Sequence, residues 1–288
     1  GPGTLGMAAT QINVFVNTLL ATREGTGAVS WLDFAFRLMY LPIGLFGVSI
    51  ATAATPAISR MVAEQDFARI RGTLANALGL MLFLNVPATV GLMILAEPIV
   101  AVIFQHGEFT AADTIATARA LQLYAIGLVG YSIVRIISPT FYALQRSRIP
   151  VMVSAASVVV NVGLNLTLVR VMGYRGLALG TSITALVNAT VQLWLLRREL
   201  DGLEGSRIVA STVRVVAAAA IMGIVTWGTH IGLLHAVPGG SFVLQASRLF
   251  VTIMLSLGAL VAAAQVLRVP EFGEARDLII GRFKRMAR

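Results

Sequence analysis

An arginine stands inside one of the most apolar stretches of the chain. Residues 30–56 read SWLDFAFRLMYLPIGLFGVSIATAATP, which places Arg37 among Phe, Leu and Met. An arginine at the centre of a bilayer costs at least about 2.5 kcal/mol, so such a residue usually faces a water-filled cavity or a charged partner. In a hydrated cavity its planar guanidinium could bind a diphosphate bidentately. The alternative is structural, because Asp33, one helical turn earlier, could neutralise the cation.

A second arginine raises the same question. Arg135 lies in GYSIVRIISPTFYALQ, four residues before Pro139. It either adds a second cation to a binding cavity or packs against carbonyl groups that the proline leaves without a donor. The residues alone leave both explanations open.

Polar amides recur at helical spacing in two other apolar segments. Asn13 and Asn17 are one turn apart, as are Asn161 and Asn165, and Thr181 follows early in the next segment. Their oxygens could coordinate a hard cation such as Na⁺ where helices meet. The simpler explanation, which the residues favour, is hydrogen bonding between helices, at about 0.6 kcal/mol for each bond.

The sequence offers no residue pattern typical of catalysis. Of its 13 acidic residues only Asp33 falls away from predicted loops and span ends, the three histidines lack the spacing of zinc ligands, and cysteine is absent. No nucleophile elbow and no phosphate-binding glycine loop is present. We therefore expect neither an enzyme nor a resident metal or cofactor, and interpret the net charge of +9 as membrane topology rather than nucleic-acid binding.

The elements that must position these residues are long apolar helices. Only 12% of the residues are charged and 57% are hydrophobic, with a mean hydropathy of +0.84. Apolar segments of about 20 residues each can cross a hydrocarbon layer as a helix, and their continuous character excludes alternating barrel strands. We predict an all-α, multi-pass membrane bundle with eight spans, at about 3–22, 28–59, 73–95, 115–144, 150–172, 175–196, 208–232 and 244–267. Pro42 and Pro139 are predicted bends.

The loops predict orientation. Most of the 22 basic residues follow the second, fourth, sixth and eighth spans. Basic loops are typically cytoplasmic, so both ends of the chain are expected in the cytoplasm. Thr110 and Asp113 predict an N-terminal cap for the fourth span. The basic tail is either a short helix on the inner leaflet or a solvated end. The opening GPGTLGMAATQ has neither an initiating Met nor a signal peptide, which leads us to expect the later part of a larger protein.

Four stretches carry a family resemblance: ATQINVFVNTLLA, VSWLDFAFRLMYLPIGLFGVSIATAATPAISR, IFQHGEFTAADT and PTFYALQRSRIPV. They resemble the MurJ/MviN lipid II flippases of the multidrug/oligosaccharidyl-lipid/polysaccharide exporter superfamily, in order along the whole chain. The resemblance aligns the chain with helices seven to fourteen of a 14-helix transporter. It implies a six-helix lobe at 1–199, two helices forming a lipid-tail groove at 200–268, and a basic cytoplasmic tail at 269–288.

The resemblance also implies a function in the bacterial inner membrane. The substrate would be an undecaprenyl-diphosphate-linked peptidoglycan precursor, moved to the outer leaflet by alternating access. Its partners would be membrane lipids and an N-terminal half of the same protein. Arg37 matches the family's cavity arginine and Ser30 a nearby serine. With Arg135 and Tyr40 they form the candidate substrate-binding set, and Asp33 is the charge partner.

This sequence departs from the family pattern at several positions, which include His106 and Glu108 in the outer-loop motif. Phe36 and Tyr40 stand where the family usually carries acids around the arginine. Asn17, Asn161, Asn165 and Thr181 match a sodium site of some members, in which the positions of Asn17 and Asn165 hold aspartates. Without those carboxylates strong Na⁺ binding is doubtful, and coupling to the membrane potential is an equal alternative.

Four other functions compete with this interpretation. The chain could belong to a flippase for another polyprenyl-linked saccharide or to a drug exporter of the same superfamily, although a cation exporter should line its cavity with carboxylates. It could instead be a non-transporting membrane scaffold, for which Arg37 and Asp33 would be dispensable together. A membrane phosphotransferase is disfavoured by the missing acidic cluster.

Overall fold

The computed structural model describes residues 2–273, and every regular element in that part of the chain is a helix. This confirms the predicted all-α class. The helices are α1 (Pro2–Ala21), α2 (Ala28–Pro42), α3 (Val48–Ala63), α4 (Phe67–Ile94), α5 (Ala96–Phe104), α6 (Ala111–Ala143), α7 (Arg148–Met172), α8 (Tyr174–Glu199), α9 (Gly205–Ala236) and α10 (Phe242–Val266), with a π-helical turn, η1 (Ile43–Gly47), between α2 and α3.

Seven helices within the described residues are long and apolar enough to cross a membrane, with α2, η1 and α3 counted as one unit. They correspond to the second through eighth predicted spans. The first predicted span coincides with α1, and its crossing of the membrane stays a prediction. The observed helices extend beyond several predicted ends. For example, α4 begins at Phe67 because the Asp66 carboxylate accepts the Arg69 N–H and caps a polar first turn that an apolar window overlooks.

The two predicted bends differ in the structure. At Pro42 the α-helical hydrogen-bond pattern gives way to η1 before α3 resumes it. Proline lacks the N–H that would continue the ladder, and a π turn adds one residue to absorb the change. At Pro139, by contrast, α6 continues to Ala143 as one helix.

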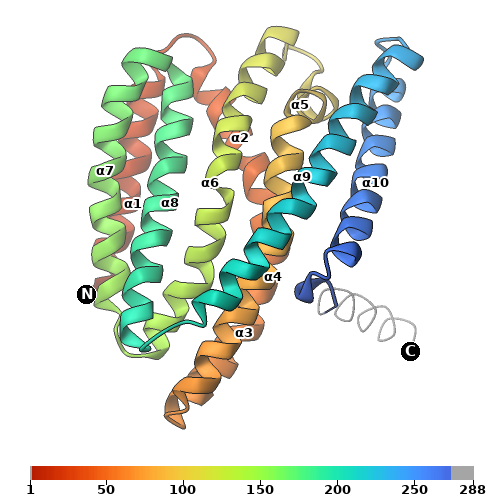
Figure 1. Cartoon of the computed structure of the whole chain (residues 1–288). Helices are drawn as coiled ribbons and strands as arrows, with labels where there is room; N and C mark the ends of the chain where they lie inside the picture. The colour runs from red at the N-terminus through yellow and green to blue at the C-terminus, as the bar shows by residue number, and fades with distance from the viewer. Residues whose placement is uncertain (1, 274–288) are drawn as a thin grey trace, which may run out of the picture.

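Helix α6 is the centre of the bundle, and it packs against α2, α3, α4, α5 and α8 (Figure 1). The α6–α8 contact brings two backbones together. A Cβ atom added at Gly130 would lie 2.7 Å from the carbonyl carbon of Ala185, and one added at Gly127 would lie 2.8 Å from Cα of Ser182. Within a membrane, apolar side chains alone provide little driving force for two helices to associate. Small residues allow the helices to approach closely enough for van der Waals contact between their backbones.

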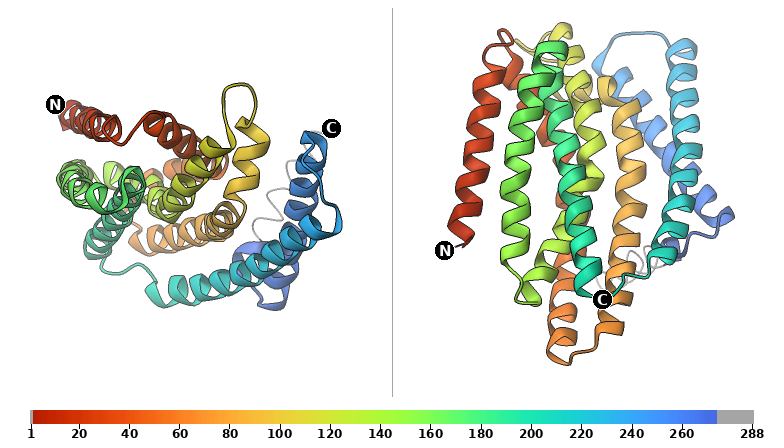
Figure 2. Two further views of the ribbon diagram at one scale, coloured as in Figure 1. Left: turned by 90° about the horizontal axis from the view of Figure 1, so that it is seen from above. Right: turned by 60° about the vertical axis from the view of Figure 1, so that its left-hand side comes forward.

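The remaining helices flank this centre. Helix α1 packs on α7, whereas α9 packs on both α4 and α10. Seen from above, α1 and α2 lie on one side of the bundle, and α8 and α9 lie on the other (Figure 2). Of the predicted tail at 269–288, Val269 and Glu271 are buried, and the Ser211 hydroxyl donates to Glu271 at 2.5 Å. Residues 274–288, which hold most of the predicted basic tail, lie outside the described part.

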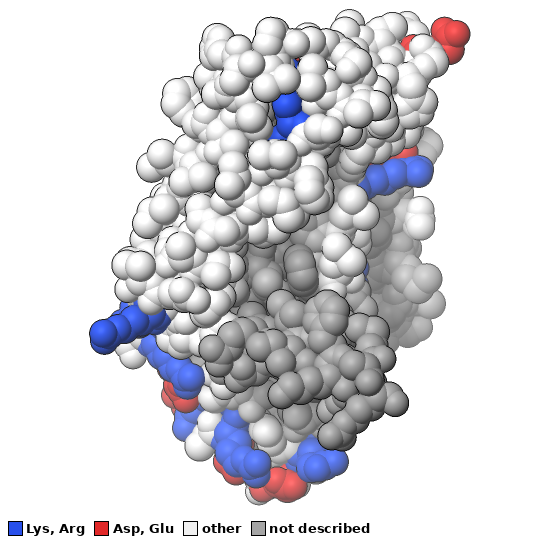
Figure 3. Space-filling model, turned by 90° about the vertical axis from the view of Figure 1, so that its right-hand side faces the viewer, with Lys and Arg blue, Asp and Glu red and all other residues white. Residues whose placement is uncertain are grey.

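The loops alternate between the two ends of the bundle as the spans predict. The loops after α3, α6 and α8 and the end of α10 all lie toward the lower end of the bundle (Figure 1). That end carries the basic loop residues, and most of the Lys and Arg side chains visible from one side gather toward it (Figure 3). At the other end the predicted cap is confirmed, since Thr110 and Asp113 form a reciprocal capping box at the start of α6.

The glycine contact between α6 and α8 predicts a specific sensitivity. Gly130→Ala should lower the free energy of unfolding in detergent by about 1–3 kcal/mol, because its methyl group would push the α8 backbone away. Gly163→Ala in α7 is the matched control. A Cβ there meets nothing within 4 Å, so the helix propensity of Ala should leave stability equal or about 1 kcal/mol higher.

Thermal unfolding of the protein expressed from its complete gene, followed by size-exclusion chromatography of the heated samples, measures both variants. Equal melting midpoints for Gly130→Ala and Gly163→Ala would contradict the close contact.

Candidate functional site

The predicted site residues of α2 lie on one open face of that helix. Ser30, Asp33 and Arg37 are spaced by three and four residues, and all three are exposed. The opposite face carries the buried residues Ala28, Leu32, Ala35, Leu38 and Met39. Because those apolar side chains fix the rotation of α2 against the core, the polar face must point away from it.

Arg37 and Asp33 form the ion pair that their spacing predicts. The Nη2 and Oδ2 atoms are 2.8 Å apart, yet the two side chains remain 70% and 51% exposed. The guanidinium lies about 14 Å along the helix from Ala28, well inside the 36-residue spanning unit. The pair neutralises the cation without enclosing it, so the guanidinium keeps N–H groups free for a phosphate.

Arg135 is held differently from the packing that Pro139 suggested. Its guanidinium donates a hydrogen bond to the Tyr40 hydroxyl and lies with Cζ 5.4 Å from the centre of the Tyr40 ring. Tyr40 in turn stacks on Phe36 at 5.6 Å, and both rings meet Tyr131 of α6 edge-on. This cluster joins α2 to α6 one turn beyond Arg37. The structure thus brings Tyr40 and Arg135 together, on the face of α2 beside the open one.

The amides of α1 and α7 form one hydrogen-bonded network. Asn13 Nδ2 donates to Asn161 Oδ1 at 3.1 Å, and Asn165 Nδ2 donates to Asn17 Oδ1 at 2.6 Å. Within the helices, Asn17 donates to Asn13 at 2.8 Å and Asn165 to Asn161 at 2.9 Å. These are the bonds between helices that the simpler explanation requires.

Thr181 does not join this network, since its hydroxyl donates to the Leu177 carbonyl of its own helix. Thr184 takes its place, accepting from Asn161 Nδ2 at 3.2 Å. The sequence does carry a signal for Thr184. It follows Gly180 by four residues, the same one-turn spacing that separates Asn161 from Asn165.

The residues present do not fit a strong cation site. Of the four asparagine side-chain oxygens in this network, those of Asn13, Asn17 and Asn161 already accept hydrogen bonds. The fourth, Asn165 Oδ1, is buried without a donor. That oxygen lies directly against Gly180. A hard cation prefers several oxygens, carboxylates among them, whereas this set is neutral. Among the described residues no group of three or more His, Cys, Asp or Glu side chains could hold a metal. The network fits a clasp between α1 and α7.

Ser30 lines a pocket of about 440 Å³ at the end of the bundle where α2 begins. The sequence did not indicate its aromatic wall, in which Phe34 lies 4.7 Å from Phe104 and 5.8 Å from Phe109 between ring centres. Trp31 closes one side by donating to Asp113 at 2.7 Å. Ser30 therefore lines this pocket and also lies on the same face of α2 as Arg37, two helical turns before it.

Comparison with known proteins identifies the family. A family model described as "Lipid II flippase MurJ" matches residues 1–247. The chain belongs to the MurJ family. A probable lipid II flippase MurJ of Bdellovibrio bacteriovorus is 34% identical over 275 residues, which cover 96% of this chain and 52% of the relative. The Vibrio cholerae counterpart is 34% identical over 227 residues, covering 79% and 42%. The chain therefore spans about half the length of the curated MurJ relatives that it matches.

The fold agrees with the family. A solved lipid II flippase MurJ in an inward closed conformation superposes with a TM-score of 0.73 at 25% identity, covering 91% of this chain and 52% of that chain. An outward-facing transporter of the multidrug resistance MATE family superposes with a TM-score of 0.61 at 13% identity, covering 96% and 66%, which shows a shared fold alone. Both matches confirm the all-α, multi-pass architecture predicted from the apolar segments.

The neutral amide network of this MurJ chain predicts indifference to sodium. Replacing Na⁺ by K⁺ should change the melting midpoint of the parent protein by less than about 1 °C, since a ligand stabilises only when it binds the folded state. The Asn17→Asp/Asn165→Asp variant supplies two carboxylates and should melt about 3 °C or more higher in Na⁺ than in K⁺. Asn188→Asp, outside the network, controls for added charge. A parent protein that melts markedly higher in Na⁺ would disprove the assignment of the network as a clasp.

Proposed function

We propose that this chain supplies the second lobe and two further helices of a transporter that moves lipid II from the inner to the outer leaflet. The observation that carries the proposal is the open Asp33–Arg37 pair inside a spanning helix. A cation kept at that depth with most of its side chain exposed is costly in lipid, and useful where water and phosphate can reach it. Membership of the MurJ family supports the same substrate class.

The proposed mechanism is electrostatic and makes or breaks no covalent bond. In the empty state the single carboxylate of Asp33 holds the guanidinium in position. A diphosphate carries more negative charge than a carboxylate and offers bidentate oxygens, so it would compete with Asp33 for Arg37. Arg135 would add a second positive charge from α6. Its guanidinium is oriented by the hydroxyl of Tyr40, which lies one turn after Arg37 on α2. Ser30 would donate to the headgroup toward the aromatic pocket.

The tail of the substrate would stay in lipid. We propose that residues 200–268 form its groove and residues 1–199 the transporter lobe. Both α9 and α10 expose large apolar side chains, including Val213 and Ile224 on α9 and Phe250 and Leu257 on α10. A polyprenyl chain could exchange contacts with these residues at little cost, because both surroundings are apolar.

The proposed location is the bacterial inner membrane, with the basic end of the bundle in the cytoplasm. Basic loops favour the cytoplasmic side, and the end formed by the loops after α3, α6 and α8 is the basic one. The proposed partners are the undecaprenyl-diphosphate-linked precursor, surrounding lipids and a first lobe facing the open side of α2.

Removing the cavity cation tests the proposal in cells. Arg37→Ala in the complete protein should abolish rescue of cells depleted of their own flippase, whereas Arg37→Lys should rescue partially, since it keeps the charge and loses the bidentate geometry. Arg170→Ala, at the exposed end of α7, is the matched control and should rescue normally. Unimpaired growth of the Arg37→Ala strain at normal expression would refute the role of Arg37.

A double substitution separates transport from a scaffold role. Replacing Asp33 and Arg37 together by leucine removes both charges, so folding should be kept or improved, because no unpaired charge is left in the membrane. The double variant should reach normal expression and melting midpoint and still fail to rescue. A scaffold would tolerate the change, so growth equal to the parent strain would favour that function instead.

A further inference from the structure

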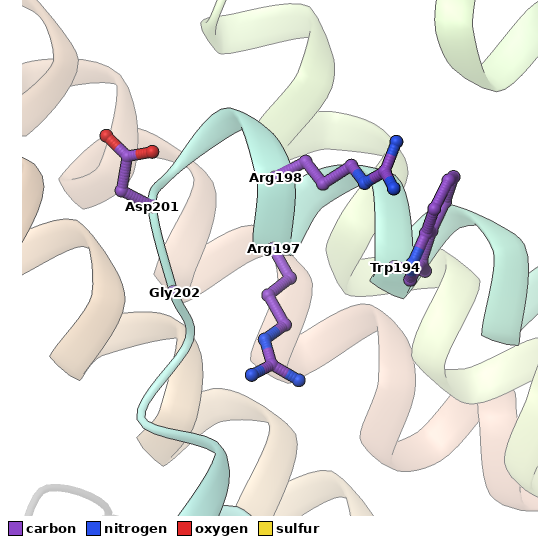
Figure 4. A pocket seen from close by; sticks show the side chains of 5 residues that line it. All are labelled: Trp194, Arg197, Arg198, Asp201 and Gly202. Carbon is purple, nitrogen blue, oxygen red and sulfur yellow. The ribbon is translucent and has the colours of Figure 1, made fainter.

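A cationic pocket lies where α8 ends, away from the proposed substrate site. It has a volume of about 520 Å³ and is lined by Trp194, Arg197, Arg198, Asp201 and Gly202 (Figure 4). Helix α8 lies on the side of the bundle away from α2, which carries Ser30, Arg37 and Tyr40 (Figure 2). Nothing in the proposed transport mechanism uses this pocket.

The guanidinium groups of both arginines are available to bind an anion. Neither Arg197 nor Arg198 forms an ion pair among the described residues, and the neighbouring Glu199 is paired with Arg146 at 3.4 Å. The guanidinium of Arg198 stacks on the Trp194 ring with Cζ 3.7 Å from its centre, which fixes its plane and leaves its N–H edge open. The Asp201 carboxylate points away from Arg198 and Trp194 (Figure 4).

An apolar stripe leads from the middle of α8 to this pocket. Val187, Val191 and Trp194 follow one another at four and three residues, and Arg198 comes four residues later. The three apolar side chains are 40%, 37% and 47% exposed, so the described chain covers them only in part. The stripe from Val187 to Trp194 is about 10 Å long, and Arg198 lies about 16 Å along the helix from Val187, so an acyl chain whose headgroup is at the arginines can cover it. Trp and Arg at its end match the composition of a headgroup region.

We propose that this pocket binds the phosphate of an anionic glycerophospholipid. Arg197 and Arg198 donate hydrogen bonds to the phosphate oxygens. One acyl chain lies along the exposed side of Val191 and Val187, toward the middle of the membrane. A free phosphate shares the headgroup chemistry, but only a lipid also covers the stripe. The site lies at the basic end of the bundle, where cationic pockets between helices meet anionic headgroups. Its role is to fix the α8–α9 connection at the membrane surface.

Lipid titrations of the delipidated protein, expressed from its complete gene, test this site by native mass spectrometry. Phosphatidylglycerol should bind more tightly than phosphatidylcholine. Arg197→Gln/Arg198→Gln should weaken phosphatidylglycerol binding by about tenfold or more. Arg60→Gln/Arg148→Gln removes two exposed charges from the same end outside the pocket, and should change binding by less than about threefold. Equal weakening by both pairs, or by neither, would overturn the proposal.

Two further arms identify the ligand and guard against misfolding. Inorganic phosphate should displace phosphatidylglycerol only weakly, and Val187→Asn/Val191→Asn should weaken lipid binding while leaving phosphate binding unchanged. Displacement by phosphate at equal concentration would assign the pocket to a free anion and overturn the lipid assignment. Arg197→Lys/Arg198→Lys keeps the charge and should lose less affinity than the glutamine pair. The melting midpoint of every variant shows whether it is folded.

Discussion

The rotation of α2 about its own axis is the constraint on which the rest of the site depends. Small and medium apolar side chains on one face pack against α6, and this packing turns Asp33 and Arg37 toward the uncovered side. The ion pair then holds the guanidinium in place without burying it. If the packing face turned by one residue, or about 100°, the arginine would point into the core, where an unpaired charge is far more costly.

The amide network, the Arg135 cluster and the Asp33–Arg37 pair follow from one principle of membrane folding. Polar side chains inside a spanning helix either satisfy one another or face water. The amides of α1 and α7 satisfy one another almost completely, and Arg135 is satisfied by Tyr40 and its aromatic neighbours. The Asp33–Arg37 pair is the grouping that remains largely open. This difference in enclosure distinguishes a structural clasp from a binding group more clearly than residue type does.

Local sequence information predicted a large part of this arrangement. Apolar windows located the spanning helices, the four-residue spacing predicted the Asp33–Arg37 pair, and Thr110 with Asp113 predicted the cap of α6. Each depends on neighbours within one or two turns. The pairing of Tyr40 with Arg135 and of Asn13 with Asn161 joins residues 95 and 148 positions apart. Such contacts depend on which helices become neighbours and at what rotation, and a single sequence does not specify either. The role of Thr184 in place of Thr181 is the same problem on a smaller scale.

The glycines of α6 have a consequence for motion. At Gly130 the α6 backbone lies directly against the α8 backbone, and at Gly127 it lies against Ser182, whose hydroxyl donates a hydrogen bond to the Leu123 carbonyl. Because the two helices pack this closely and share a hydrogen bond, we expect α6 and α8 to move together. Any rocking of the lobe must be absorbed elsewhere. The π turn after Pro42 interrupts the α-helical hydrogen-bond pattern, so we expect the α2–α3 unit to bend there more readily than α6 or α8.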